Sequence, residues 1–151
     1  MATPTNVSNV APARQYARVV TTNALSLGLG VTVTTANTAK DGTGTVVTPY
    51  NNTSLADSVC DGIYVAFTGT SVATVLRIFI NNGLTNASAG NNSLLKSVSV
   101  PANTLSEVAA APDFFVPLDI TLPPGYKINC TIGTSVAAAL ALTGVGADYG
   151  V

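Results

Sequence analysis

Alternating apolar residues next to a double-proline turn constrain the fold of this chain more than any other feature. Apolar side chains occupy every second position at the start of one segment: Phe114, Val116, Leu118 and Ile120. This period of two places them on one face of an extended strand. The sequence Leu-Pro-Pro-Gly-Tyr over 122–126 then ends the strand, because prolines lack backbone donors and glycine can adopt the positive φ of a tight turn. The alternation resumes at Ile128, Cys130 and Ile132, so the chain is expected to reverse direction at Gly125.

Weaker versions of the same pattern recur along the chain. They predict strands over 27–34, 45–48, 63–68, 75–80, 94–100 and 138–142. Residues 14–22 fit a strand or a short helix, and the β-branched residues at their end favour the strand. Asp41-Gly42 and Asn82-Gly83 are typical of tight hairpins, whereas the longer segments 49–61, 84–93 and 101–113 suit crossings between two sheets. The predicted fold is therefore all-β, an antiparallel β-sandwich or jelly roll of about eight strands, in a single domain over 14–151.

Residues 1–13 are expected to form an extended N-terminal arm outside this domain. They are mostly Ala, Pro, Thr, Asn and Ser, and they show no periodicity. Such a segment cannot bury enough apolar surface to fold by itself, but it can become ordered against a neighbouring molecule. The candidate partner contacts are Thr3, Pro4, Val7, Val10, Pro12 and Arg14.

The composition favours self-assembly and argues against two classes of partner. Charged residues make up only 9% of the chain, against about 25% in an average soluble domain. The net charge is −1, so electrostatic repulsion does not oppose the packing of subunits side by side. The six Lys and Arg residues are scattered, which argues against nucleic-acid binding, and the apolar runs are too short to span a membrane.

The sequence also indicates where the chain is made. No charged segment followed by an apolar one is present at the start, so no export signal is recognised and synthesis is expected in a cytoplasm. Cytoplasmic thiols stay reduced, and Cys130 alternates in phase with Ile128 and Ile132. Cys60 and Cys130 are therefore expected to be unpaired structural thiols.

The residues that usually carry catalysis are scarce. Histidine is absent, which removes the commonest general base and the commonest metal ligand. The acidic residues lie mostly in expected loops or at strand ends, where aspartate ordinarily forms turns: Asp41, Asp57, Asp61, Glu107, Asp113, Asp119 and Asp148. Asp57 and Asp61, close to Asn51 and Asn52, leave a calcium site open, but the regular ligand spacing of a calcium loop is missing. No catalytic residue, cofactor or metal ligand is predicted, and the chain is expected not to be an enzyme.

Three aromatic side chains point outward from their expected strands: Tyr64, Phe79 and Phe115. Such side chains can form a platform for sugar stacking, but they fit packing at a subunit interface or under a loop better. Triplets of the type Asn-x-Ser/Thr occur at Asn6, Asn86 and Asn129. They arise by chance in a chain this rich in Asn, Ser and Thr, and they are not expected to be glycosylated.

Two passages resemble a known class of proteins. The first is Thr34–Val47 (TTANTAKDGTGTVV) with the strands DGIYVAF and VLRIFINNG, and the second is the passage from Phe115 through Gly125 that ends in LPPGY. Together with the closing Gly-Ala-Asp-Tyr-Gly over 146–150, they resemble the decoration, or cement, proteins of tailed-bacteriophage capsids. The resemblance covers roughly residues 28–149. It implies a jelly-roll-like fold and a homotrimer on the outside of the head, bound to the major capsid protein.

Two functions follow as expectations. The first is a structural virion protein, synthesised in the bacterial host cytoplasm, that binds the capsid exterior and stabilises the capsid by bridging neighbouring capsomers. A trimer with three equivalent arms would gain avidity, because the second and third contacts become intramolecular. The alternative is a receptor-binding or carbohydrate-binding β-domain of a tail fibre, which the outward aromatics and the Asn-rich loops favour.

Overall fold

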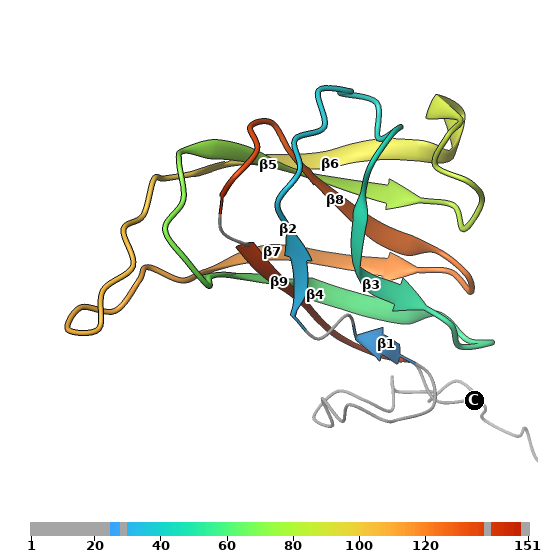
Figure 1. Ribbon diagram of the computed structural model, residues 1–151. Helices are drawn as coiled ribbons and strands as arrows, with labels where there is room; N and C mark the ends of the chain where they lie inside the picture. Colours follow the sequence, from blue (N-terminus) through green and yellow to red (C-terminus); the bar gives the residue numbers. More distant parts are fainter. Residues whose placement is uncertain (1–24, 28–29, 138–139, 149–151) are drawn as a thin grey trace, which may run out of the picture.

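The chain folds into two antiparallel β-sheets packed face to face (Figure 1). The computed structural model describes residues 25–27, 30–137 and 140–148. The five-stranded sheet contains, in order, β1 (Leu25–Leu27), β3 (Val47–Asn52), β8 (Lys127–Ile132), β5 (Thr74–Asn81) and β6 (Asn92–Val100). The four-stranded sheet contains β2 (Val31–Val33), β9 (Leu140–Asp148), β4 (Ser58–Phe67) and β7 (Phe114–Leu122). Within the described ranges the one helical element is a 3-10 turn, η1 (Ala89–Asn91). The prediction of an all-β sandwich is confirmed.

The order of the strands is that of a jelly roll. β2 pairs with β9, β3 with β8, β4 with β7, and β5 with β6, so strands from opposite ends of the chain lie side by side. This is the pattern of a long antiparallel hairpin that has been rolled into two sheets of four strands. β1 lies outside the roll and extends the five-stranded sheet by pairing with β3. β1 and β6 form the two edges of that sheet, and β2 and β7 form the edges of the other.

The core lies between the two sheets and follows the predicted alternation. Along β7 the burial pattern alternates, with Val116 and Leu122 buried and Phe115, Pro117 and Thr121 exposed. The fully buried apolar side chains come from both sheets: Ile63, Val65, Leu140 and Leu142 from one, and Leu76, Ile78, Ile128 and Ile132 from the other. The predicted reversal at Gly125, which has φ 82°, is also confirmed.

One core aromatic depends on two glycines. Tyr50, on β3, is fully buried, and its hydroxyl donates a 3.0 Å hydrogen bond to the carbonyl of Val59 on β4. Its ring lies against Gly144 and Gly146 of β9. A Cβ on Gly144 would stand 2.8 Å from the Tyr50 Cβ, and one on Gly146 would stand 2.7 Å from the Tyr50 hydroxyl oxygen. The missing side chains therefore provide the space for the ring.

The two cysteines are free thiols in this core, as predicted. Cys60 comes from β4 and Cys130 from β8, so one thiol belongs to each sheet. Burial raises the pKa of Cys60 to about 12 and raises the pKa of Cys130 further. A raised pKa favours the protonated thiol at neutral pH, and the protonated thiol is the form that does not act as a nucleophile.

Two predicted local structures are wrong. Residues 27–34 do not form one strand, because the chain turns at Gly30 (φ 62°) and places β1 and β2 in different sheets. Asp41-Gly42 does not form a tight hairpin, since β2 and β3 also belong to different sheets. The Asp41 carboxylate instead accepts hydrogen bonds from the hydroxyl of Thr43, at 2.7 Å, and from its backbone N–H, at 3.0 Å. These bonds hold the pKa of Asp41 below its usual value and shape a broad loop.

The predicted hairpin at Asn82-Gly83 is present, but a long loop joins its two strands in place of a tight turn. β5 and β6 are antiparallel neighbours in one sheet, and residues 82–91 separate them. The prediction that 84–93 crosses between the two sheets is therefore wrong. Asparagine side chains build this loop. Asn82 Nδ2 donates to Asn91 Oδ1 at 3.1 Å, and Asn86 Nδ2 donates to the Gly44 carbonyl at 2.7 Å. Because these amides bind within the protein, the Asn-rich loop is a folded structural element.

Candidate interaction surface

An aromatic pair stands on the outer face of the four-stranded sheet. Tyr64 of β4 and Phe115 of β7 are direct cross-strand partners, with ring centroids 4.8 Å apart and planes tilted by 46°. Gly62 makes room for the pair, because a Cβ there would lie 2.5 Å from Phe115 Cζ. Tyr64 is 50% exposed and Phe115 is 39% exposed. The sheet therefore presents an apolar aromatic surface to solvent.

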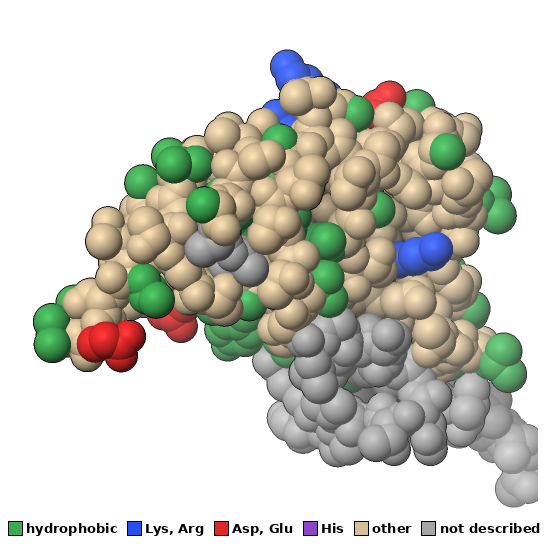
Figure 2. Space-filling view, viewed as in Figure 1, with side chains coloured by type: hydrophobic (Ala, Val, Ile, Leu, Met, Phe, Trp, Pro, Cys, Tyr) green, Lys and Arg blue, Asp and Glu red, His purple; other side chains and the backbone are tan. Residues whose placement is uncertain are grey.

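The strand next to this pair adds only small, uncharged side chains. Tyr64 is opposite Thr143 of β9. The residues of β9 that alternate with its buried ones are partly exposed: Ala141, Thr143, Val145 and Ala147. The two strands that carry the pair also hold two carboxylates, Asp61 of β4 and the exposed Asp119 of β7. The uncharged part of the face is therefore the aromatic pair with β9, and such a surface can contact another protein at little desolvation cost. The wider surface has the same character, since charged side chains are few in the visible face of the molecule (Figure 2).

Phe79, the third aromatic predicted to be exposed, is fully buried. Its side chain points away from the core, as the alternation predicts, but the β2–β3 loop covers it. A Cβ on Gly42 would lie 3.1 Å from Phe79 Cδ1. The loop is held over the five-stranded sheet by Asn37, whose N–H donates to the Ile132 carbonyl at 2.8 Å. Phe79 therefore packs under a loop, which is one of the two arrangements that the sequence favoured, and a sugar-stacking platform of three aromatics is excluded.

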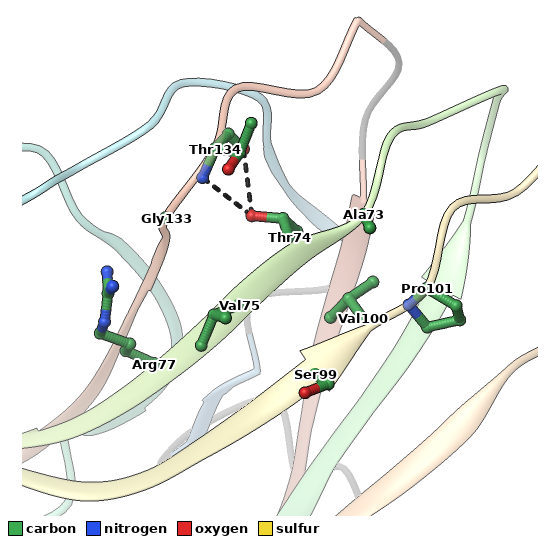
Figure 3. Close-up of a pocket in the computed structure, with 9 residues that line it drawn as sticks. All are labelled: Ala73, Thr74, Val75, Arg77, Ser99, Val100, Pro101, Gly133 and Thr134. Carbon is green, nitrogen blue, oxygen red and sulfur yellow. Dashed lines mark hydrogen bonds between the residues drawn. The ribbon is translucent and has the colours of Figure 1, made fainter.

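A hollow of about 690 Å³ lies on the outer side of the five-stranded sheet (Figure 3). Ala73, Val75, Val100 and Pro101 give it an apolar lining, and Arg77 stands at one side. The remaining lining residues are Thr74, Ser99, Gly133 and Thr134. The Thr74 hydroxyl holds the β8–β9 segment in place, since it accepts from the Thr134 N–H at 2.9 Å and donates to the Thr134 carbonyl at 3.1 Å. The hollow thus combines an apolar surface with one cationic group.

Among the described residues, the Arg77 guanidinium has a neutral hydrogen-bond acceptor and no carboxylate partner. Arg77 Nη1 donates to the Asn37 carbonyl at 3.2 Å, and that acceptor is neutral. Gly133 allows the guanidinium to lie close to the β8–β9 segment, because a Cβ there would be 3.3 Å from Arg77 Nη2. A guanidinium has five N–H donors in a planar fork, which matches a carboxylate in two-point contact. This side of the hollow therefore suits an anionic group.

The β6–β7 loop, residues 101–113, projects from the same end of the sandwich. Near its base, Ser71 and Asn103 exchange backbone hydrogen bonds of 2.8 and 2.9 Å, and the Leu105 N–H donates to Thr70 Oγ1 at 3.1 Å. Beyond these bonds the chain runs away from the strands to a tip (Figure 1, lower left). This projecting part, the loop tip, begins with the anchored Leu105, whose side chain is exposed, and continues with exposed Glu107 and Val108, of which Val108 is 97% exposed. Apolar and acidic side chains gather there (Figure 2).

The other predicted sites have different outcomes. The predicted contacts of the N-terminal arm lie outside the described residues, as does the predicted strand over 14–22: Thr3, Pro4, Val7, Val10, Pro12 and Arg14.

At the possible calcium site, the side-chain amide of Asn52 already forms hydrogen bonds within the protein. Its Nδ2 donates to the carbonyls of Leu122 and Ala56, and its Oδ1 accepts from the Ser54 N–H. The described part of the chain contains no group of three or more Cys, Asp or Glu side chains that could hold a metal ion. It also contains no helix long and apolar enough to cross a bilayer.

Sequence reasoning missed the hollow and the loop tip, although two signals were available. Arg77 is the single charge on the outward face of a strand, between Val75 and Phe79. The connection over 101–113 interrupts its polar residues with Leu105 and Val108 on either side of the sole glutamate of the chain. A loop of that length that exposes apolar side chains is often a functional element.

The described residues define an all-β jelly-roll domain with an aromatic sheet face, an amphipathic hollow and a projecting loop. Comparison with protein-family models, with curated proteins and with solved structures finds no match for this chain.

Proposed function

We propose that this chain is a non-enzymatic structural protein of a bacteriophage particle. In this proposal it is a homotrimeric decoration, or cement, protein that binds the major capsid protein on the outer surface of the head and bridges neighbouring capsomers. The observation that carries the proposal is the half-exposed Tyr64–Phe115 pair beside the small, neutral side chains of β9. Exposed aromatic groups are typical of protein–protein interfaces. The resemblance to capsid decoration proteins supplies the identity of the partner.

The physical mechanism is binding at several points at once. A trimer that meets a symmetric position on the shell presents three copies of each contact. Once the first copy is bound, the other two contacts form at a high effective concentration, so the trimer binds far more tightly than one subunit. Free energy released at the bridges then opposes separation of the capsomers, and no chemical step is required.

Electron microscopy of purified particles tests the location. We expect density for the jelly roll on the outer surface of the head. Density for this chain on the tail alone would contradict the proposal.

Titration of undecorated heads tests the surface. The variant Tyr64→Ala with Phe115→Ala should bind at least about tenfold more weakly, because aromatic anchors contribute strongly to interfaces. Leu55→Ala is the matched control, since Leu55 is 94% exposed in the β3–β4 loop, away from the aromatic pair in sequence. Equal binding by the aromatic variant and the control would exclude this sheet face.

The N-terminal segment supplies a separate test of the attachment device. A variant that starts near Arg14 should keep its fold and its trimeric state, because residues 1–13 contribute nothing to the predicted core. It should occupy heads much more weakly, since each lost contact recurs three times per trimer. If it occupies heads as fully as the intact protein does, the arm is not the attachment device.

The exposed aromatic pair also favours a second candidate, a carbohydrate-binding domain of a tail fibre. Aromatic rings can stack against sugar rings. A glycan array distinguishes the candidates: glycan binding that is abolished by Tyr64→Ala, without binding to heads, would favour the tail-fibre function. Phe79→Ala is not a suitable test, because Phe79 is buried under the β2–β3 loop.

A further inference from the structure

We propose that the loop tip of one copy, Leu105, Glu107 and Val108, inserts into the hollow beside Arg77 of the next copy. The inference rests on the self-association in the proposed function and names the contact that produces it. Glu107 would pair with Arg77, and the apolar residues of the tip would cover the apolar lining of the hollow. The partner is therefore a second copy of this chain.

The loop tip has the composition of a buried contact but is exposed in the single chain. Val108 is almost completely accessible to solvent, and Leu105 is 46% exposed. Removing apolar groups of this size from water is favourable. Hydrogen bonds at the base of the loop hold it in a projecting position, which reduces the conformational entropy lost on binding. The tip is thus preorganised to enter another molecule.

The hollow is complementary to the loop tip in apolar character and in charge. Its exposed apolar residues, Ala73, Val75 and Pro101, can receive leucine and valine side chains. Arg77 adds a positive charge whose hydrogen bond goes to a neutral carbonyl. Glu107 carries the opposite charge and lies between the two apolar residues of the tip. Charge and hydrophobic character therefore match between the two surfaces.

The arrangement favours a contact between copies over a contact within one chain. The hollow includes Pro101, where the loop begins, but none of the residues at the loop tip. From Pro101 the loop passes its anchor at Ser71 and then runs away from the sheets (Figure 1). The loop tip and the hollow are different surfaces, so a contact between them joins two copies head to tail. Repetition of this contact forms a closed ring when the rotation that relates neighbouring copies is a whole fraction of a full turn. A ring of three copies satisfies every tip and every hollow.

Charge reversal with restoration tests the pairing. The dissociation constant of self-association is measured by sedimentation equilibrium for the intact protein and for three variants, Glu107→Lys, Arg77→Glu and the double variant. Each single change should raise this constant at least about tenfold, because it places like charges together. The double variant exchanges the charges and should return to within about threefold of the intact protein. Circular dichroism and melting temperature show which variants are folded.

Asp113→Lys is the matched control for Glu107→Lys. It makes the same change in net charge on an exposed residue of the same loop, at the base and not at the tip. If both lysine variants weaken association equally, the effect is one of overall charge and the inference is overturned. Arg77→Glu alone could disturb the fold through the lost bond to Asn37, so the decisive comparison is between the double variant and Glu107→Lys.

The outcomes separate this inference from the proposed function. If the intact protein is monomeric at concentrations well above those used in head binding, the inference is overturned. If trimers form and depend on the Glu107–Arg77 pair but do not bind heads, the inference holds and the capsid function fails. If heads are bound by trimers whose association does not change in the folded variants, the function stands and this contact is excluded.

Discussion

At the scale of single residues, the stability of the fold depends on glycines, because a missing side chain leaves room for a neighbouring group. Gly144 tests this directly. The variant Gly144→Ala should lower the free energy of unfolding by about 1–3 kcal/mol, because the added methyl group overlaps the Pro49 carbonyl, 2.5 Å from the ideal Cβ position, and the side chain of Tyr50. Urea denaturation followed by tyrosine fluorescence measures the change.

Gly90→Ala is the control for this experiment. Gly90 lies in η1, and no atom is within 4 Å of its ideal Cβ position. Its substitution should change the free energy of unfolding by no more than about 0.5 kcal/mol. Similar losses in the two variants would show that Tyr50 does not need the space at Gly144.

The buried thiols give a prediction about reactivity and pH. Cys60 and Cys130 should react with a thiol reagent at about pH 8 only when denaturant unfolds the chain, because burial raises both pKa values. Their contribution to stability is fully present below the unfolded pKa of about 9 and is lost as pH rises toward the folded values. Between these limits each thiol lowers the free energy of unfolding by up to about 1.4 kcal/mol per pH unit. Rapid labelling of the native protein would contradict this prediction.

At the scale of elements, the exposed edge at β6 is protected by an inward-facing charge. Lys96 is the register partner of the buried Ile78, so its side chain starts on the core side of the strand. Its ammonium group donates a 3.0 Å hydrogen bond to the Pro117 carbonyl on β7, the edge strand of the other sheet. Inward-pointing charges and edge prolines both discourage a sheet from adding strands of other molecules. Lys96 therefore closes the open side of the sandwich.

Replacement of Lys96 tests this role. Lys96→Val should produce assemblies larger than those of the intact protein, because valine favours strands and carries no charge at the edge. Light scattering during incubation at raised temperature measures their formation. Lys96→Arg keeps the charge and should behave as the intact protein does. Equal rates for the valine and arginine variants would show that the edge is protected in another way.

The same elements show which parts of the fold can be predicted from sequence. Strands β4, β5, β7 and β8 follow the predicted alternation, because a period of two is a local property of a half-buried strand. Packing of Phe79 under a loop was among the favoured arrangements, but which loop covers it was not predictable, since the burial of this side chain depends on Gly42 from a distant segment. The candidate surface was predicted only in part: Tyr64 and Phe115 were identified, but their pairing depends on register, and the hollow at Arg77 is formed by three separate strands and loops.

At the scale of the whole molecule, the exposed apolar side chains lie on more than one surface. The Tyr64–Phe115 pair belongs to the four-stranded sheet, whereas the tip of the β6–β7 loop projects from the end of the sandwich. In the two proposals these surfaces have separate partners, the shell for the aromatic face and a second copy for the tip. The aromatic variant should therefore lose binding to heads while its trimer remains intact.

The rolled order of the strands has a consequence for synthesis. β4 and β9 pair at the centre of the four-stranded sheet, although roughly 70 residues lie between the end of β4 and the start of β9. At about 5–20 residues per second, a ribosome needs several seconds to supply them. During that time the nascent chain exposes the unpaired edge of β4 and the apolar side chains of Ile63 and Val65. Contacts between segments so far apart also form slowly, so the newly made chain depends on protection from aggregation until its last strand is released.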